Sequence, residues 1–284
     1  MMTIPSKYNK FVQILRELES VAVAFSSGVD STFLLKTAHE ILGNRVLAVT
    51  VRADLFPKRE IDAAIQFAKA EGIEHVLVDV EALDIAGFAQ NPVNRCYLCK
   101  REIFSCIRRL AKERGISHVV EGSHAEDRSE DRPGLQAIAE LGVLSPLREA
   151  GLNKSEIRQL SRKQGLPTWN KQSLACLASR VPYGEEITKE RLTMIDKAEQ
   201  HLLDAGFQQV RVRVHGNLAR IETDEEGLER LLDKKLREEI HRRFQEIGFV
   251  YSSVDLLGYR TGSMNEVRGQ SAPDRWSEPD LASP

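Results

Sequence analysis

The stretch FSSGVDS, residues 25–31, follows the apolar run VAVAF and precedes the segment TFLLKTAHEIL. An apolar run that ends in small residues and passes into a helical apolar pattern is typical of a buried strand joined by a tight loop to a helix. Small residues let backbone N–H groups approach an anion closely, and the following helix adds the positive end of its dipole. The stretch therefore predicts a phosphate-binding loop.

The alternation of strand and helix continues along the first half of the chain. The predicted strands are residues 21–25, 45–51, 75–80 and 117–123, with helical patterns at 32–42, 58–72 and 99–115 between them. Repeated strand–helix units indicate an α/β domain with a parallel sheet that helices cover on both faces. Ligands of such sheets bind beyond the carboxyl ends of the strands, which is where FSSGVDS lies.

Beyond the first domain, which we expect to span residues 1–170, the pattern changes. Residues 171–187 have little periodicity and several turn residues, which predicts a linker or active-site loop. Residues 188–267 read as helix, hairpin, helix and strand, which indicates a smaller α+β domain with an antiparallel sheet. Residues 268–284 are polar and rich in Pro and Ser, which predicts a disordered tail.

The composition is that of an ordinary globular protein, with 284 residues, 42% hydrophobic side chains and a net charge of -2. Near-neutral charge argues against general nucleic-acid binding. No run approaches the roughly 18 apolar residues of a membrane span, and the N-terminus MMTIPSKYNK lacks the apolar core of a secretory signal. We therefore expect a cytoplasmic protein without membrane partners, whose 4 cysteines serve metal, redox or catalytic chemistry rather than disulfides.

The hydroxyls of Ser26, Ser27 and Ser31 are placed to donate hydrogen bonds to the same anion. The loop is not a Walker A motif, because the GxxxxGK[ST] spacing and its lysine are absent. An aspartate beside a phosphate requires a cation between them, so Asp30 is a candidate magnesium ligand. The alternative is an ordinary strand-to-helix turn with Asp30 as an acid at the helix N-terminus.

SSGVDS resembles the SGGxDS loop of the PP-loop ATP pyrophosphatases, with Ser27 where glycine is usual. Further segments match in order: EGSHAEDRSEDRPG at 121–134, PTWNKQ at 167–172, QSLACLASRVPYG at 172–184 and RVRVHGNLARIE at 211–222. Together they resemble the LarE-type sulfur transferases of that superfamily, from about residue 5 to residue 265. The loop at 121–134 contributes four acids, Glu126, Asp127, Glu130 and Asp131, with His124 and Glu126 where relatives commonly have Asn and Asp.

The resemblance implies an adenine nucleotide alpha hydrolase-like PP-loop domain followed by the smaller α+β domain, and a homo-oligomer. It also implies that ATP adenylates a carboxylate of pyridinium-3,5-biscarboxylic acid mononucleotide and that sulfur then displaces AMP to give a thiocarboxylate. Such a step belongs to the synthesis of the nickel-pincer nucleotide cofactor. An acyl-adenylate carries a good leaving group that a carboxylate lacks, and one cleft for both reactants removes much of the entropic barrier.

Carried over residue by residue, the resemblance assigns ATP and magnesium binding to the loop and to Asp127, with Asp30 as the magnesium ligand. The loop residues in this assignment are Ser26, Ser27, Gly28, Val29, Asp30 and Ser31. Cys176 matches the sulfur-bearing cysteine, which in sacrificial members gives up its own sulfur. Ser179 and Arg180 are expected to help hold the substrate phosphate.

Arg211 and Arg213 alternate with valines in VRVRV, so both guanidinium groups point to one face of a strand, roughly 7 Å apart. That spacing suits binding of a phosphate or of a carboxylate-rich nucleotide. The alternative is a solvated sheet face with ordinary arginines. The family resemblance favours the binding role.

Cys96 and Cys99 form a CxxC motif, and Cys176 lies on the loop expected near the same cleft. Three thiolates can hold a [4Fe-4S] cluster with one iron open, and the resemblance supports this, because a three-cysteine subset of LarE-like proteins uses such a cluster. An open iron would bind hydrosulfide from a sulfide donor. The alternatives are sacrificial loss of sulfur from Cys176, a zinc half-site and a redox dithiol. Cys106 falls on an apolar helix face and is expected to be a core thiol.

Other functions remain open at this stage. A tRNA thiolase of the same superfamily would use the basic segment KREIFSCIRRLAKERG, although its charges surround an apolar stripe typical of a solvated helix. A non-catalytic ATP-binding sensor would keep the loop and release no pyrophosphate. Tyr97, between the two cysteines, either stacks on a pyridinium ring or packs as an ordinary aromatic residue.

Overall fold

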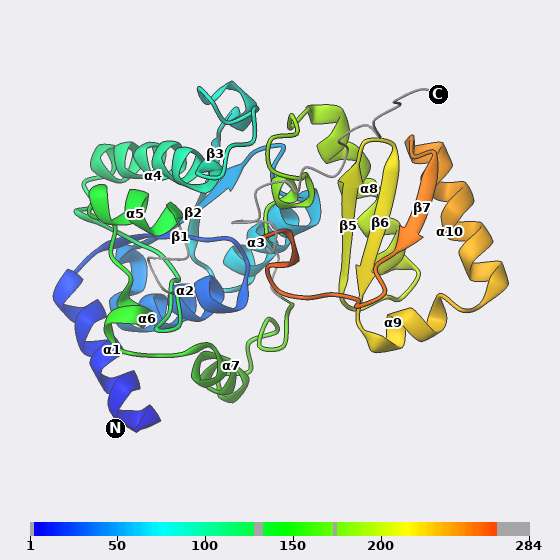
Figure 1. Ribbon diagram of the computed structural model, residues 1–284. Coiled ribbons are helices and arrows are strands. Elements are labelled where there is room, and N and C mark those ends of the chain that lie inside the picture. The colour runs from blue at the N-terminus through cyan, green and yellow to red at the C-terminus, as the bar shows by residue number, and fades with distance from the viewer. Residues whose placement is uncertain (1–2, 128–132, 173–174, 266–284) are drawn as a thin grey trace, which may run out of the picture. The chain divides into compact units, whose positions relative to one another are not determined.

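The computed structural model describes residues 3–127, 133–172 and 175–265 (Figure 1). The chain divides into two compact units, Met1–Ala198 and Glu199–Pro284, with the division inside helix α8 (Lys189–Asp204). Glu130, Asp131 and the segment 268–284, which sequence analysis singled out, lie outside the described residues.

The first unit is built on a four-stranded sheet in the order β3-β2-β1-β4, and all its strand pairs are parallel. The strands are β1 (Val21–Ala24), β2 (Val46–Arg52), β3 (Glu74–Asp79) and β4 (His118–Val120). This confirms the predicted parallel α/β sheet. The order reverses between β1 and β4, so the loops after these two strands diverge and leave space for a ligand at their carboxyl ends.

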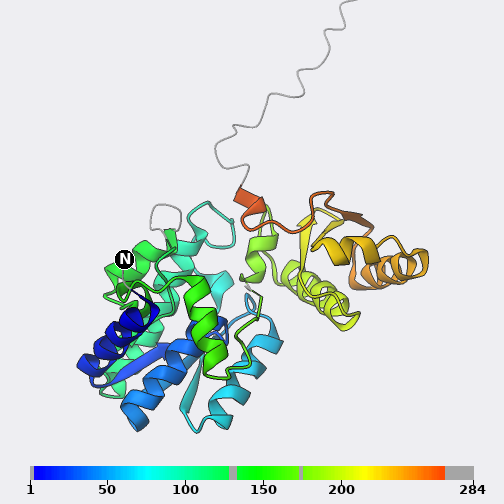
Figure 2. The same cartoon turned by 90° about the horizontal axis from the view of Figure 1, so that it is seen from below.

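Helices cover both faces of this sheet (Figures 1 and 2). Helices α4 (Arg95–Glu113) and α5 (Pro133–Glu140) pack together on one face. On the other face α2 (Val29–Leu42) packs against α1 (Ile4–Leu18) and α7 (Lys154–Lys163). The remaining helices are α3 (Lys58–Ala70) and α6 (Pro146–Glu149), with short 3-10 turns at Gly43–Arg45, Ala82–Asp84 and Leu177–Arg180.

The core of the first unit lies between α1, α2 and the sheet. The aromatic rings of Phe11 and Phe33 stack with centroids 5.6 Å apart, and both side chains are fully buried. Apolar residues of β1 and β2 complete this core, including Val21, Val23 and Ala48. Because β1 and the first turns of α2 are buried in it, the loop between them has a rigid support.

The second unit contains the three-stranded sheet β5-β6-β7, formed by Val210–His215, Leu218–Thr223 and Tyr251–Val254. Strands β5 and β6 form the expected antiparallel hairpin, but β6 and β7 are parallel. The prediction of an antiparallel sheet is therefore confirmed for β5 and β6 and wrong for β7. The physical reason is the helical crossover between β6 and β7, which returns the chain to the same end of the sheet before the last strand.

The crossover consists of two helices, α9 (Glu225–Arg230) and α10 (Lys234–Ile247), where the sequence pattern indicated one. The Asp233 side chain accepts a hydrogen bond from the Leu236 N–H at 2.8 Å and so begins α10 as its N-cap. Aspartate at an N-cap competes with continuation of a preceding helix, which accounts for the break.

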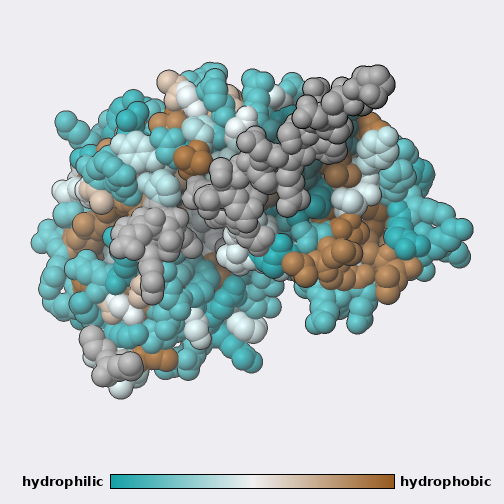
Figure 3. Space-filling view, in the orientation of Figure 1, coloured by the Kyte–Doolittle hydropathy of each residue, from teal (hydrophilic) through white to brown (hydrophobic). Residues whose placement is uncertain are grey.

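Apolar side chains gather on part of the surface of the second unit (Figure 3). Leu256 is 93% exposed, and Leu257 and Tyr251 are also largely exposed. Within the described ranges, the chain has no helix whose length and apolar character would let it cross a membrane.

Candidate active site

The phosphate-binding loop joins β1 to α2, as the sequence predicts. Gly28 is the N-cap residue of α2, and no side chain in the described part of the chain caps its first turn. The Ser26 N–H donates to the Ser31 Oγ at 3.3 Å, and the two hydroxyl oxygens lie 3.1 Å apart. Val29 is buried, so it contributes backbone rather than side chain to the loop surface. First-turn N–H groups and two adjacent hydroxyls form a suitable site for phosphate oxygens.

The Ser27 side chain has a different environment from those of Ser26 and Ser31, the other two serines of the loop. Its φ of 54° lies in the left-handed region, which glycine adopts without strain. Its buried hydroxyl donates to the Glu60 backbone oxygen at 3.1 Å and to Glu60 Oε2 at 3.2 Å. Lys171 Nζ donates to the Ser27 backbone oxygen at 3.1 Å and to Glu60 Oε2 at 2.7 Å. The Ser27 side chain therefore faces Glu60 and Lys171.

Two arginines of helix α7 contact residues 169–171, the segment that contains Lys171. Arg158 donates from Nη1 to the Trp169 carbonyl and from Nη2 to the Lys171 carbonyl, each at 2.9 Å. Arg162 lies over the Trp169 ring, 4.9 Å from its centroid. These contacts place the Lys171 ammonium behind the phosphate loop, where it links the segment 169–171 to Ser27.

Asp30, the predicted magnesium ligand, forms an ion pair with Lys154 through Oδ2. Its Oδ1 is buried and has no hydrogen-bond partner among the described residues. Gly122, which follows β4 after Glu121, packs so closely on the loop that an added Cβ would lie 3.0 Å from the Ser31 nitrogen. The carboxyl end of β4 therefore meets the phosphate loop at Asp30.

The acids of the 121–134 loop have distinct roles. Glu126 Oε2 accepts a hydrogen bond from the Lys154 N–H at 3.0 Å and thereby satisfies the first turn of α7. Asp127 is buried, and its Oδ2 accepts from the His124 N–H at 3.0 Å. Of the predicted acids, Asp127 thus orders the loop and Glu126 joins it to α7.

Residues around Asp30 fit a magnesium ion that is shared with ATP. Magnesium in such sites takes one or two carboxylates and completes its shell with phosphate oxygens and water. The Asp30 Oδ1 atom is an acceptor without a donor in the described ranges, whereas Oδ2 is paired with the Lys154 ammonium, so Oδ1 is the atom open to a metal ion.

Asn91 anchors the segment that follows Cys176 to the start of α4. It is fully buried, and its Nδ2 donates to the carbonyls of Val181 and Pro182 at 3.2 and 2.6 Å. Its Oδ1 accepts from Arg95 Nη1 at 2.6 Å. This junction brings the Cys176 loop to the helix that carries the CxxC motif.

The three predicted ligand cysteines interact with one another. Cys96 and Cys99 lie at the start of α4. Burial raises the pKa of the Cys99 thiol, and the nearby charges of Cys176 and Cys96 raise it further. Burial also raises the pKa of Cys176, with Cys96 acting in the same direction. Cys106 is also buried, and its sulfur contacts Glu102 and Arg109.

The thiols of Cys96, Cys99 and Cys176 are chemically suitable ligands for an iron–sulfur cluster. In the described part of the chain, no group of three or more His, Cys, Asp or Glu side chains has an arrangement that could hold a metal ion. The three thiols nevertheless lie close enough for Cys96 to raise the pKa of both Cys99 and Cys176, and Arg95 and Arg180 place positive charge near Cys176. Thiolates are the ligands of iron–sulfur clusters, and nearby cations stabilise the negative charge of such a cluster.

Arg180 is fully buried and its side chain bonds to the backbone of the Cys176 loop. Its Nη1 donates to the carbonyls of Ala175 and Cys176 at 2.5 and 2.9 Å, and lies 3.1 Å from Ser179 Oγ. Ser179 is half-buried, and its N–H donates to the Cys176 carbonyl at 3.0 Å. Arg180 and Ser179 therefore stabilise the turn that presents Cys176.

In the second unit, Arg211 and Arg213 are 4% and 5% exposed. The alternative of a solvated sheet face is therefore wrong. Arg213 Nη2 donates to Glu222 Oε2 at 2.8 Å and to Ser263 Oγ at 3.1 Å, and Arg211 lies over the Tyr259 ring. Both guanidinium groups are desolvated, a state in which charge-assisted hydrogen bonds are strong.

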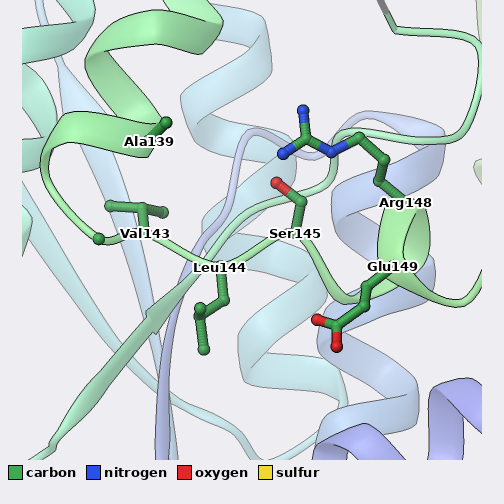
Figure 4. Close-up of a pocket in the computed structure, with 7 residues that line it drawn as sticks. Ala139, Val143, Leu144, Ser145, Arg148 and Glu149 are labelled. Atoms are coloured by element: carbon green, nitrogen blue, oxygen red, sulfur yellow. The ribbon is translucent and has the colours of Figure 1, made fainter.

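The first unit also has a surface pocket, lined by other residues (Figure 4). Its lining includes Leu144, Ser145, Arg148 and Glu149, and none of the residues predicted to act on a substrate. The Ser145 hydroxyl is used inside the protein, since it donates to Glu121 Oε1.

Sequence analysis missed four residues that contact or lie near the predicted site residues: Glu60, Lys154, Lys171 and Arg95. Lys171 lies in PTWNKQ, a segment whose only signal in the sequence is its resemblance to the LarE-type family. Lys154 follows the N-cap Asn153 in a capping box, a signal that marks a helix start and says nothing of a phosphate site. Glu60 and Arg95 are charged helix residues that are distinguished only by their tertiary contacts, since Glu60 is half-buried beside Ser27 and Arg95 is buried near Cys176.

No family model matches the chain. The chain is 41% identical to an uncharacterized protein of Synechocystis over 93% of its length and 98% of that protein. It is 35% identical to the pyridinium-3,5-bisthiocarboxylic acid mononucleotide synthase of Lactiplantibacillus plantarum over 94% of its length and 96% of the synthase. More distantly, one of the subunits of the glutamine-hydrolyzing GMP synthase of Pyrococcus furiosus is 26% identical over 66% of the chain and 64% of that subunit. The chain therefore belongs to the LarE-type family of PP-loop proteins, the family of the Lactiplantibacillus synthase.

Proposed function

We propose that the chain is an ATP-dependent sulfur transferase that adenylates a carboxylate of pyridinium-3,5-biscarboxylic acid mononucleotide and replaces AMP by sulfur. The observation that carries the proposal is the near full-length match to a pyridinium-3,5-bisthiocarboxylic acid mononucleotide synthase. The phosphate loop after β1 and the cysteine loop are both present in the first unit, so the chain has groups for both half-reactions.

The first half-reaction uses the loop between β1 and α2. The N–H groups at the start of α2 and the hydroxyls of Ser26 and Ser31 would hold the phosphates that leave as pyrophosphate. Asp30 would hold magnesium, which neutralises phosphate charge when bound. Lys154 would then move from the Asp30 carboxylate to a phosphate oxygen, because the metal replaces its positive charge.

The second half-reaction needs sulfur at Cys176. We propose that Cys96, Cys99 and Cys176 hold a [4Fe-4S] cluster, which when bound would offer an open iron for hydrosulfide. The electrostatic coupling of the three thiols supports this assignment. The backbone contacts of Arg180 and Ser179 would keep Cys176 in place.

Arg211 and Arg213 of the second unit are proposed to bind the substrate phosphate. Two buried guanidinium groups on one strand support this role. We expect the Arg211→Ala and Arg213→Ala double variant to lose binding of the pyridinium mononucleotide. Unchanged binding would remove the two arginines from the site.

The adenylation step is tested by exchange of pyrophosphate into ATP with the pyridinium mononucleotide as the acid. We expect exchange in the wild type and its loss in Asp30→Asn, with Asp62→Asn as the control, since Asp62 lies on α3 in an exposed ion pair with Lys58. No exchange in the wild type would contradict the proposed function. Exchange with tRNA alone would indicate the thiolase instead.

The sulfur source is tested by anaerobic purification, iron and sulfide analysis, and an absorption spectrum. We expect iron and sulfide that are lost in Cys96→Ser and Cys176→Ser but retained in Cys106→Ser. An iron-free protein whose Cys176 loses the mass of hydrogen sulfide on turnover would establish the sacrificial route.

We also propose that the protein is cytoplasmic, forms a homo-oligomer and receives sulfide from a donor. All four cysteines are unpaired, which suits a reducing compartment. Light scattering of the full chain measures the number of copies.

A further inference from the structure

Arg95 is a buried cation without a carboxylate partner among the described residues. It is the first residue of α4 and is 3% exposed. Its Nε is buried and makes no hydrogen bond to any described residue. A desolvated charge without a counter-ion is costly, and proteins retain such groups mainly where an anion binds.

Two contacts hold the Arg95 guanidinium in place. Nη1 donates to Asn91 Oδ1 at 2.6 Å, and the group stacks on the Tyr183 ring, 4.1 Å from its centroid. Asn91 is itself anchored to the carbonyls of Val181 and Pro182. Neither contact supplies negative charge, so both fix the orientation of the guanidinium and leave its charge uncompensated.

Arg95 also lies close enough to Cys176 to interact with its sulfur electrostatically. Arg180 does so too, but its Nη1 is occupied by the carbonyls of its own loop. Arg95 bonds to Asn91 through Nη1, and its buried Nε makes no hydrogen bond to the described residues, so the side-on edge that includes Nε is available to an acceptor. That edge matches a planar carboxylate, which accepts two parallel N–H bonds from it.

We propose that Arg95 forms a carboxylate-binding subsite beside the sulfur of Cys176, and that it binds a carboxylate of the aromatic acid substrate. The assignment of the ligand rests on the proposed function, whose substrate carries two carboxylates on one ring. Bound to Arg95, one carboxylate would orient the ring relative to the sulfur. The Tyr183 ring, which supports the guanidinium from one face, would limit the carboxylate to the free edge.

A charge-matched pair of alkylating reagents tests this subsite without ATP or turnover. Iodoacetate and iodoacetamide have the same shape and leaving group, and only iodoacetate carries a carboxylate. The Cys176 thiolate attacks the methylene carbon of either reagent, an S–C bond forms and iodide leaves. The ratio of their rate constants at Cys176, read by peptide mass spectrometry on the iron-free full chain, cancels changes in thiol reactivity.

We expect Arg95→Met to lower the iodoacetate-to-iodoacetamide ratio about tenfold, as loss of a charge-assisted hydrogen bond should. Arg95→Lys should recover part of the ratio, because it restores the charge without the planar edge. Arg101→Met is the matched control, since Arg101 lies on the same helix with an aromatic contact but is exposed. A wild-type ratio in Arg95→Met would overturn the proposal.

A second measurement uses only the wild type, in case the Arg95 variants do not fold. Pyridine-3,5-dicarboxylate should slow alkylation of Cys176 by iodoacetamide, whereas the neutral pyridine-3,5-dicarboxamide should not. Equal protection by both compounds, or by neither, would contradict a carboxylate subsite. If these results hold while pyrophosphate exchange is absent, the subsite stands and the proposed function fails.

Discussion

At the residue scale, Ser27 shows how a departure from the family pattern is accommodated. Glycine is usual at this position in the loop that SSGVDS resembles, and the left-handed φ of 54° explains why glycine suits it. Ser27 keeps the same backbone conformation with a buried hydroxyl bound to Glu60. Hydrogen bonds to Glu60 and Lys171 thus offset the strain that a side chain introduces.

This balance predicts an unusual order of stability. Ser27→Ala loses the hydroxyl contacts and keeps the strain, so its free energy of unfolding should fall by about 1–2 kcal/mol. Ser27→Gly loses the same contacts but relieves the strain, and should stay within about 1 kcal/mol of the wild type. Urea unfolding of the three proteins measures the order. An alanine variant more stable than the glycine variant would contradict this account.

Lys171 is the second residue-scale case. Its ammonium bonds to the Ser27 carbonyl and to Glu60, so Lys171→Met should loosen the loop that holds the phosphates. We expect the KM for ATP in pyrophosphate exchange to rise about tenfold, the cost of one charge-assisted bond, with a smaller change in kcat. Lys163→Met, in the exposed last turn of α7, is the control and should leave both constants unchanged.

At the scale of elements, the site depends on one asparagine that joins two segments. Asn91 links the start of α4 to the residues after Cys176 through bonds to Arg95, Val181 and Pro182. Cys96 and Cys176 come from these two segments, so their proximity depends on this junction. The junction is the structural reason why a loop without regular periodicity has a defined position.

We therefore expect Asn91→Ala to release the Cys176 loop. Two buried hydrogen bonds and the Arg95 contact are lost, which should lower the free energy of unfolding by about 2–3 kcal/mol. Alkylation of Cys176 by iodoacetamide should also become faster. Asn94→Ala is a matched control, because Asn94 is the exposed N-cap of the same helix and its side chain makes no capping bond to the described residues. Equal effects of the two variants would argue against the junction.

At the scale of the whole molecule, each of the two compact units pairs cationic side chains with carboxylates. In the first, Lys154 pairs with Asp30 and Lys171 pairs with Glu60 at the phosphate loop, and Arg95 and Arg180 place positive charge near Cys176. In the second, Arg213, Arg220 and Glu222 form a network within the sheet. The second unit therefore holds its arginines by ion pairs, and a phosphate ligand would have to compete with carboxylates for them.

His75 links the stability of the whole molecule to pH. Burial lowers the pKa of His75 below its ordinary value, and its ring packs on Phe25 at the start of the phosphate loop. A base with a lowered pKa in the folded state contributes stability above its unfolded pKa, about 6.5, and this stability is lost as pH falls through the folded value. The free energy of unfolding should therefore fall below pH of about 6.5, and less so in His75→Gln. An identical pH profile for the variant would contradict this.

The sequence by itself determined the parallel α/β fold and the position of the phosphate loop. Both depend on local signals, namely apolar periodicity and a run of small residues between a strand and a helix. It also indicated the three interacting cysteines, through the CxxC spacing and the family resemblance. The separate helices α9 and α10 were missed, because the apolar period continues across the Asp233 N-cap.

Only the tertiary structure determined which cationic side chains lie against the phosphate loop and Cys176, and which charged side chains are buried. Lys154 reaches Asp30, Lys171 reaches Ser27, and Arg95 reaches Cys176, each from a distant part of the chain. Spacing within a strand placed Arg211 and Arg213 on one face, but their burial depends on residues that return to the sheet after β7. Such pairings arise when segments that are distant in the sequence pack together, so no local sequence pattern predicts them.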